Sequence, residues 1–200
     1  MQHSDKQKRL RIFFTGVGGQ GTLTATTLLA RTALDAGQDV VAGEVHGMAQ
    51  RGGAVTTVVR LGDSVASMVA DKGSVDYLVS FEKVEALRNI EFLKDGGALL
   101  VNDEFIKPLP VATGAVQAPS GVVESLEQAG AVLVPAKALA KEAGSVKAVN
   151  VVLLGALSTK LNYDEATWLS VIESRVPAKF KDVNIAAFKL GRKFVEECSA

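Results

Sequence analysis

The sequence predicts an α/β fold, with a Rossmann-like, mostly parallel sheet, helices on both faces and a helical C-terminal extension. Short runs of Val, Leu and Ile alternate with helical patterns between residues 10 and 134, which is the order of βαβ units. Most of these runs are apolar throughout, as expected of strands covered on both faces. From about residue 135 to 200 the pattern is mostly helical. We therefore expect a flexible leader over 1–9 and a single domain over 10–200.

The chain opens with a strand, a loop and a helix. The apolar run at 10–14 predicts a strand that enters the glycine-rich GVGGQG of 16–21. Leucines then recur about one turn apart over 22–36, which predicts a helix. Gly37 is placed to end that helix, and DVVAGE at 39–44 predicts a second strand.

The middle of the chain continues this alternation. The β-branched residues of AVTTVVRL predict a strand over 54–61. The Gly-Asp pair at 62–63 would turn it into a return segment, SVASMVA, to make a hairpin. VDYLVSF predicts a buried strand over 75–81, which a helix over 82–94 follows.

The remaining elements are shorter. A turn at 95–97 leads to a strand over 98–102. Three of the five prolines fall within 103–120, which predicts irregular structure there. A helix over 122–129 and a strand over 131–134 follow. The rest of the chain predicts helices over 136–143, 147–161, 164–175 and 178–197.

Composition excludes several classes of function. The chain has 22 basic and 22 acidic residues, so no global field attracts nucleic acid or an anionic membrane. Its one cysteine, Cys198, cannot ligate an iron–sulfur cluster, build a cysteine zinc site or form an internal disulfide. No apolar stretch reaches a signal-peptide core or a membrane span. We therefore expect a cytoplasmic protein with no bound metal.

The first loop has the spacing of a dinucleotide fingerprint. Gly16, Gly18 and Gly21 fit G-x-G-x-x-G, and Glu44 follows Gly21 by 23 positions at the end of the second strand, where it would hold a ribose. A P-loop is excluded because Thr22 stands where the lysine is required. Three interpretations stay open: a phosphate site, a complete NAD or FAD site, or glycines that serve packing alone.

The second loop, EVHGMAQRGGAV at 44–55, has the most unusual composition. It holds an imidazole, an amide and a guanidinium among glycines; these residues are His46, Gly47, Gln50, Arg51, Gly52 and Gly53. Arg51 could clamp a phosphate or carboxylate, or the loop could form a subunit interface. His46 could act as a base or serve as a hydrogen-bonded structural residue, and only Glu44 is a nearby partner.

Four segments in order are more specific than either loop alone: GVGGQG, EVHGMAQRGG, VDYLVSFEKVEALR and NVVLLGAL. Together they make the chain resemble the small (beta or gamma) subunit of the 2-oxoacid:ferredoxin oxidoreductases over about residues 10–197. Carried onto this sequence, the resemblance matches the first loop at Gly16, Gly18, Gly19, Gln20 and Gly21. It matches the second at Glu44, His46, Gly47, Gln50, Arg51, Gly52 and Gly53.

The resemblance implies oxidative decarboxylation of a 2-oxoacid with coenzyme A, giving an acyl-CoA and reduced ferredoxin. Family members use thiamine diphosphate and iron–sulfur clusters. This chain has no Gly-Asp-Gly, with which the thiamine motif begins, and only one cysteine. The resemblance thus implies a large alpha-type partner that holds both cofactors, with this chain at the interface, Arg51 facing the active site and the first loop contacting coenzyme A phosphate or the partner.

The helical tail through Phe188–Gly191 and the chain length favour the indolepyruvate branch of the family, and hence an aryl pyruvate as the 2-oxoacid. Two other functions stay open at this point. A self-sufficient Rossmann protein would bind NAD or FAD on its own, and an assembly scaffold would bind no ligand.

Overall fold

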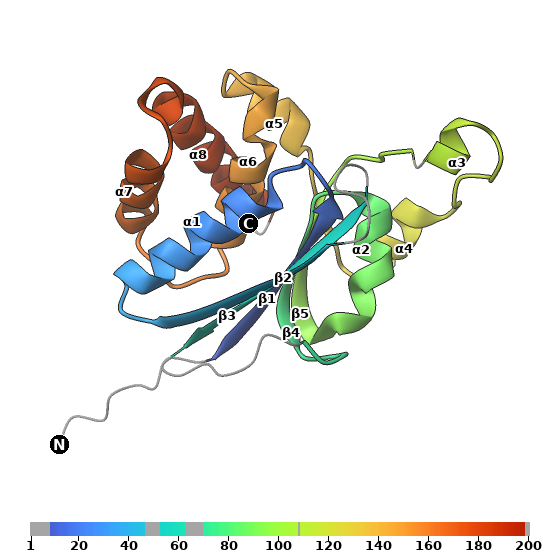
Figure 1. Cartoon of the computed structure of the whole chain (residues 1–200), viewed down its shortest axis with the longest axis horizontal. Helices are drawn as coiled ribbons and strands as arrows, with labels where there is room; N and C mark the ends of the chain where they lie inside the picture. The colour runs from blue at the N-terminus through green and yellow to red at the C-terminus, as the bar shows by residue number, and fades with distance from the viewer. Residues whose placement is uncertain (1–8, 47–52, 63–69, 108, 199–200) are drawn as a thin grey trace.

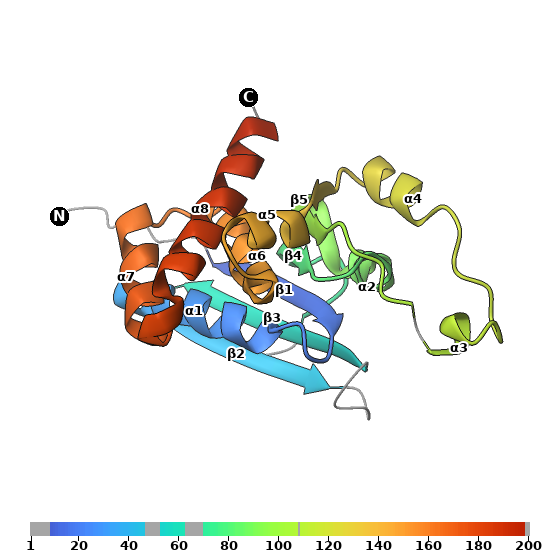
Figure 2. The same cartoon turned by 90° about the horizontal axis from the view of Figure 1, so that it is seen from above.

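The computed structural model describes residues 9–46, 53–62, 70–107 and 109–198. A central sheet is covered by helices on both faces, and the C-terminal helices gather over one of them (Figure 1). Figure 2 shows the same layers from above, with α3 (Leu109–Ala112) and α4 (Val122–Gln128) on the opposite side of the sheet from α7 (Glu165–Arg175). Within the described ranges, no helix is long and apolar enough to cross a membrane.

The sheet has six strands in the order β2-β3-β1-β4-β5-β6. The strands β1, β4, β5 and β6 pair in parallel, and β3 pairs antiparallel with both β1 and β2. In chain order the strands are β1 Leu10–Val17, β2 Asp39–His46, β3 Ala54–Gly62, β4 Val75–Ser80, β5 Leu93–Asn102 and β6 Val132–Val134. The predicted fold, a mostly parallel sheet with helices on both faces, is confirmed.

The placement of β3 differs from a Rossmann sheet, in which the second strand lies beside the first. Here β3 returns antiparallel and inserts between β1 and β2. The reason is the length of the connection: only residues 47–53 join β2 to β3, and a parallel crossover needs a dozen residues or more. The return segment expected at 63–69 lies outside the described residues.

The helices agree with the predicted spans to within a few residues, except for the helix expected over 82–94 and a short helix within the stretch expected to be irregular. Helices α1, α5, α6, α7 and α8 cover one face, and α2 and α4 pack together on the other (Figure 1). Their bounds are α1 Thr22–Asp35, α2 Lys83–Asn89, α3 Leu109–Ala112, α4 Val122–Gln128, α5 Ala136–Glu142, α6 Val149–Ser158, α7 Glu165–Arg175 and α8 Lys181–Cys198, with 3-10 turns η1 Ile90–Phe92, η2 Val146–Ala148 and η3 Ala178–Phe180.

One predicted boundary is wrong. The helix expected over 82–94 ends at Asn89, and β5 begins at Leu93 and runs through the turn expected at 95–97. Gly96 has φ +71°, and the β4–β5 register shifts between Val75 and Tyr77. Gly96 and Gly97 therefore accommodate an irregularity inside a long strand instead of ending it.

Neighbouring residues on each strand are buried on opposite faces, which explains the apolar runs. Phe13 belongs to the core under α2 and α4, and Phe14 to the larger core under α1 and α6. In β4, Leu78 belongs to the core under α2 and α4, and Val79 belongs to the larger core. The larger core extends into the C-terminal helices, where the fully buried Trp168 contacts the rings of Tyr163 and Phe188.

Tyr163 joins this core to the end of α1. Its hydroxyl donates to Gln38 Oε1, and burial raises the pKa of Tyr163 to about 12, from 10.0. Because the folded pKa of Tyr163 lies above the unfolded one, the stabilisation by the neutral phenol is complete below pH 10 and declines as the pH rises toward 12.

We expect phenolate absorbance to show one tyrosine titrating near pH 12, and Tyr163→Phe to remove that titration. A titration of Tyr163 near pH 10 in the folded protein would contradict this.

Candidate functional site

The first loop lies between the ends of β1 and β4, the neighbouring strands whose following helices lie on opposite faces of the sheet. Helix α1 follows β1 on one face and α2 follows β4 on the other, so the loop occupies the crevice at the carboxyl ends of the strands where α/β proteins bind ligands. Gly21 caps α1 with φ +83°, and Gly19 has φ +102°. Both conformations favour glycine.

The side chain of Gln20 bridges the two sides of this crevice. Its Oε1 accepts from Val17 N–H at 2.7 Å, and its Nε2 donates to the Phe81 carbonyl at 2.9 Å, so one side chain joins the loop to the end of β4. A Cβ on Gly16 would lie 2.8 Å from both Gln20 Oε1 and Phe81 Cβ. Glycine is therefore required at 16 for the amide to fit, independently of any ligand.

Further contacts hold the loop from both sides. Gly18 N–H donates to the Gly53 carbonyl at 2.8 Å, which ties the first loop to the end of the second. A Cβ on Gly21 would lie 2.8 Å from Nδ2 of Asn150, which is 8% exposed. The N–H groups of Val17 and Gly18 are thus used within the protein, and Gln20 N–H donates to the Val17 carbonyl at 3.2 Å. These three donors are therefore not available to a phosphate.

Beside the loop, a polar network occupies the carboxyl ends of β4 and β5. The buried Glu82 caps α2 by accepting from Glu85 N–H at 2.9 Å. The fully buried Asn102 donates to the Phe81 carbonyl at 3.1 Å, and Lys83 pairs with Asp103 at 2.6 Å. These acids, singled out by neither loop motif, are committed to capping and pairing.

Glu85 in α2, which follows Glu82, has a raised pKa. Burial raises the pKa of Glu85, the Arg88 guanidinium 2.7 Å away lowers it, and the charge of Glu82 raises it. The net direction is upward, so Glu85 holds its proton to a higher pH than an exposed glutamate does.

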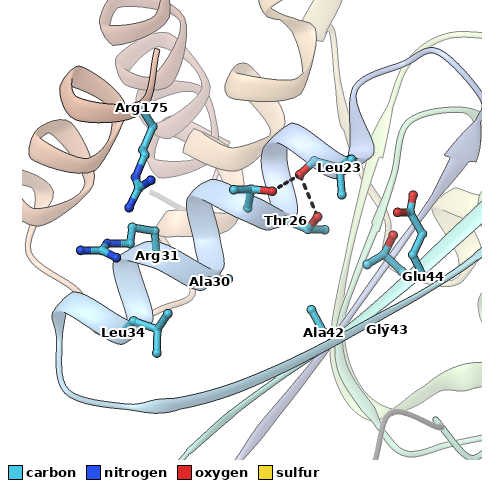
Figure 3. A pocket seen from close by; sticks show the side chains of 11 residues that line it. Leu23, Thr26, Ala30, Arg31, Leu34, Ala42, Gly43, Glu44 and Arg175 are labelled. Carbon is cyan, nitrogen blue, oxygen red and sulfur yellow. Dashed lines mark hydrogen bonds between the residues drawn. The ribbon is translucent and has the colours of Figure 1, made fainter.

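Glu44 does not join the glycine loop. It lies in β2, with the whole of β3 between it and β1, so it is two strand spacings, about 10 Å, from β1. The arrangement that a dinucleotide fold uses to hold a ribose is therefore absent. Glu44 instead lines a cavity between β2 and α1 (Figure 3).

The second loop is described only at its ends. His46 is the last residue of β2, opposite Val55, and Gly53 precedes β3. Gly47, Gln50, Arg51 and Gly52 lie outside the described residues, as does the side chain of His46. The second loop connects β2 to β3, and Gly53 at its end accepts a hydrogen bond from the first loop.

Neither loop motif marks Asn150 or Thr57. Asn150 donates from Nδ2 to the Gly21 carbonyl at 3.4 Å although the two residues are 129 positions apart in the sequence, so no local pattern predicts the contact. Thr57 is 2% exposed, and its hydroxyl has no hydrogen-bond partner. A polar residue within the apolar strand AVTTVVRL is the only signal that could have marked it. In the described part of the chain, no group of His, Cys, Asp and Glu could hold a metal ion.

Comparison with known proteins places this fold. The family model for pyruvate ferredoxin/flavodoxin oxidoreductase matches residues 11–194. Indolepyruvate oxidoreductase subunits IorB from Thermococcus kodakarensis and Pyrococcus horikoshii are 43% and 44% identical, over 95% of this chain and 98% of each relative. The keto/oxoacid ferredoxin oxidoreductase gamma subunit of Geobacter sulfurreducens has the same fold, with a TM-score of 0.70, 24% identity, and coverage of 94% of this chain and 99% of that one. The chain belongs to the pyruvate ferredoxin/flavodoxin oxidoreductase family.

Proposed function

We propose that this chain is the small subunit of a 2-oxoacid:ferredoxin oxidoreductase that acts on indolepyruvate or a related aryl pyruvate. The observation that carries the proposal is the nearly end-to-end likeness to two IorB subunits at 43% and 44% identity. Likeness at this level over almost the whole of both chains supports a shared role as well as a shared fold.

The reacting cofactors belong to a larger partner in this proposal. The only cysteine, Cys198, is exposed near the C-terminus, and one thiolate cannot hold a cluster. The sequence also lacks the Gly-Asp-Gly with which a thiamine diphosphate site begins. Thiamine diphosphate in the partner would supply the carbanion chemistry and the clusters would pass electrons to ferredoxin, so this chain's residues would bind, orient and exclude water.

The second loop is the segment that we assign to the junction with the partner. It connects β2 to β3, and Gly18 of the first loop donates a hydrogen bond to Gly53 at its end. In this assignment Arg51 and Gln50 face the active site and contact coenzyme A, while the first loop contacts the partner. The internal hydrogen bonds of the first loop favour that division of roles.

We expect Arg51→Ala to raise KM for coenzyme A or lower kcat by tenfold or more in the assembled enzyme. A charge-assisted hydrogen bond contributes about 1.5–3 kcal/mol, which corresponds to roughly 10- to 100-fold. Arg51→Lys is the matched control, because it keeps the charge, loses the bidentate geometry and should give an intermediate effect. Unchanged kinetics in Arg51→Ala would show that Arg51 does not contact coenzyme A or the active site.

The experiment that tests the function is anaerobic co-purification of the chain from its native cells. Mass spectrometry should identify a larger co-purifying chain, and visible absorption should show iron–sulfur clusters. The complex should then reduce ferredoxin faster with aryl pyruvates than with branched 2-oxoacids. A chain that purifies alone, colourless or with a bound nucleotide, would overturn the proposal.

A further inference from the structure

From the geometry of the cavity between α1 and β2 we infer a binding site for a small aromatic carboxylate, separate from both loops. The cavity has a volume of about 400 Å³, within the range of small-molecule sites and near its lower end. Its walls are largely apolar, with side chains from one face of α1 and the facing strand; these include Leu23, Ala30, Leu34 and Ala42. Leu23 and Leu34 are 60% and 49% exposed, so the two leucines form an open apolar rim.

One end of the cavity is cationic. Figure 3 shows Arg175, from the end of α7, reaching toward Arg31 on α1, close to the end marked by Leu34. Arg31 pairs with Asp35 at 2.9 Å, but Arg175 makes no ion pair with any residue that the structure describes. A guanidinium without a counterion at the mouth of an apolar cavity favours a carboxylate, which it can bind with two parallel hydrogen bonds.

The other end carries hydrogen-bonding oxygens. Glu44 and Thr57 are opposite each other on β2 and β3 and so share one face of the sheet, and both line the cavity. Figure 3 places Glu44 at the end away from Arg175, on the side of Leu23. A ligand with a carboxylate at one end and an N–H or O–H at the other would match both ends.

Thr57 is the observation that points to a ligand instead of an incidental groove. Its side chain is 2% exposed and its hydroxyl oxygen has no hydrogen-bond partner. The other two threonines of the cavity differ: Thr26 and Thr27 both donate to the Leu23 carbonyl, at 3.0 and 2.7 Å. An unpaired buried hydroxyl destabilises a fold, and valine would fill the same space without that penalty. A ligand N–H would satisfy the Thr57 oxygen.

The test is titration calorimetry of the full chain with indole-3-propionate, whose carboxylate and ring N–H lie at opposite ends of an apolar body. We expect saturable binding at one site, at least tenfold weaker in Arg175→Gln and several-fold weaker in Thr57→Val. Lys147→Gln removes one exposed positive charge in η2, away from the cavity, and should bind as the original does. Indole, which lacks the carboxylate, should bind weakly to the original and lose nothing further in Arg175→Gln.

Stability separates a binding role for Thr57 from a structural one. Thr57→Val should be at least as stable as the original in urea, because it removes an unpaired hydroxyl, although it binds the probe less tightly. In the assembled enzyme, Arg175→Gln should remove one class of probe sites and leave turnover of the 2-oxoacid unchanged, so this test is independent of the proposed activity. No binding by the full chain, equal binding by Arg175→Gln, or loss of the site on assembly with the partner would each overturn the inference.

Discussion

Gly155→Ala is expected to destabilise the protein by about 3 kcal/mol or more, the upper part of the range for overpacking a core. A Cβ at this position in α6 would lie 2.0 Å from the Phe188 carbonyl oxygen and 3.1 Å from Arg192 N in α8. Because these atoms belong to a helix backbone, no side-chain rotation relieves the overlap. The two helices would have to separate along their whole contact.

The reciprocal position makes the same contact from the other helix. A Cβ on Gly191 would lie 1.9 Å from the Val152 carbonyl oxygen, so Gly191→Ala should be as damaging as Gly155→Ala. Urea unfolding of the full chain is the measurement. Lys189→Ala is the matched control, because it places the same methyl at an exposed position of the same helix. A midpoint for Gly155→Ala equal to that of Lys189→Ala would show that the helices do not approach this closely.

Gln20→Met is expected to destabilise the protein by about 2 kcal/mol and to loosen the glycine loop. The variant keeps the length of the side chain but loses both hydrogen bonds. The Phe81 carbonyl keeps its second partner, Asn102 Nδ2, whereas Val17 N–H loses the acceptor that Gln20 provides. Leaving a partly buried donor unpaired accounts for most of the expected loss.

Hydrogen exchange tests this assignment residue by residue. The Val17 and Gly18 amides should exchange faster in Gln20→Met, since Gly18 donates to Gly53 from the same loop. Gln20→Glu separates the two bonds: it can still accept from Val17 but presents a carboxylate to the Phe81 carbonyl. It should therefore protect Val17 while destabilising the end of β4. Unchanged exchange in both variants would refute the bridging role of Gln20.

Local sequence determined most of the elements. Apolar runs and leucine spacing located most strands and helices to within a few residues, because periodicity and burial act on neighbouring positions. The spacing also identified both loops, and GVGGQG with EVHGMAQRGG identified the family. The exception is the region around Gly96, where a glycine pair typical of a turn lies inside β5. Pairing with β4 outweighed the local preference there.

Tertiary structure alone decided which residues meet. Only the assembled sheet shows that β3 enters between β1 and β2 and separates Glu44 from the glycine loop. The bridge from Gln20 to Phe81 and the contact of Asn150 with Gly21 likewise join residues 61 and 129 positions apart. In the sequence Thr57 resembles any other strand residue, and only the structure shows that it is buried. Such contacts depend on strand order and helix packing, which arise from the simultaneous burial of distant segments, and no local pattern encodes them.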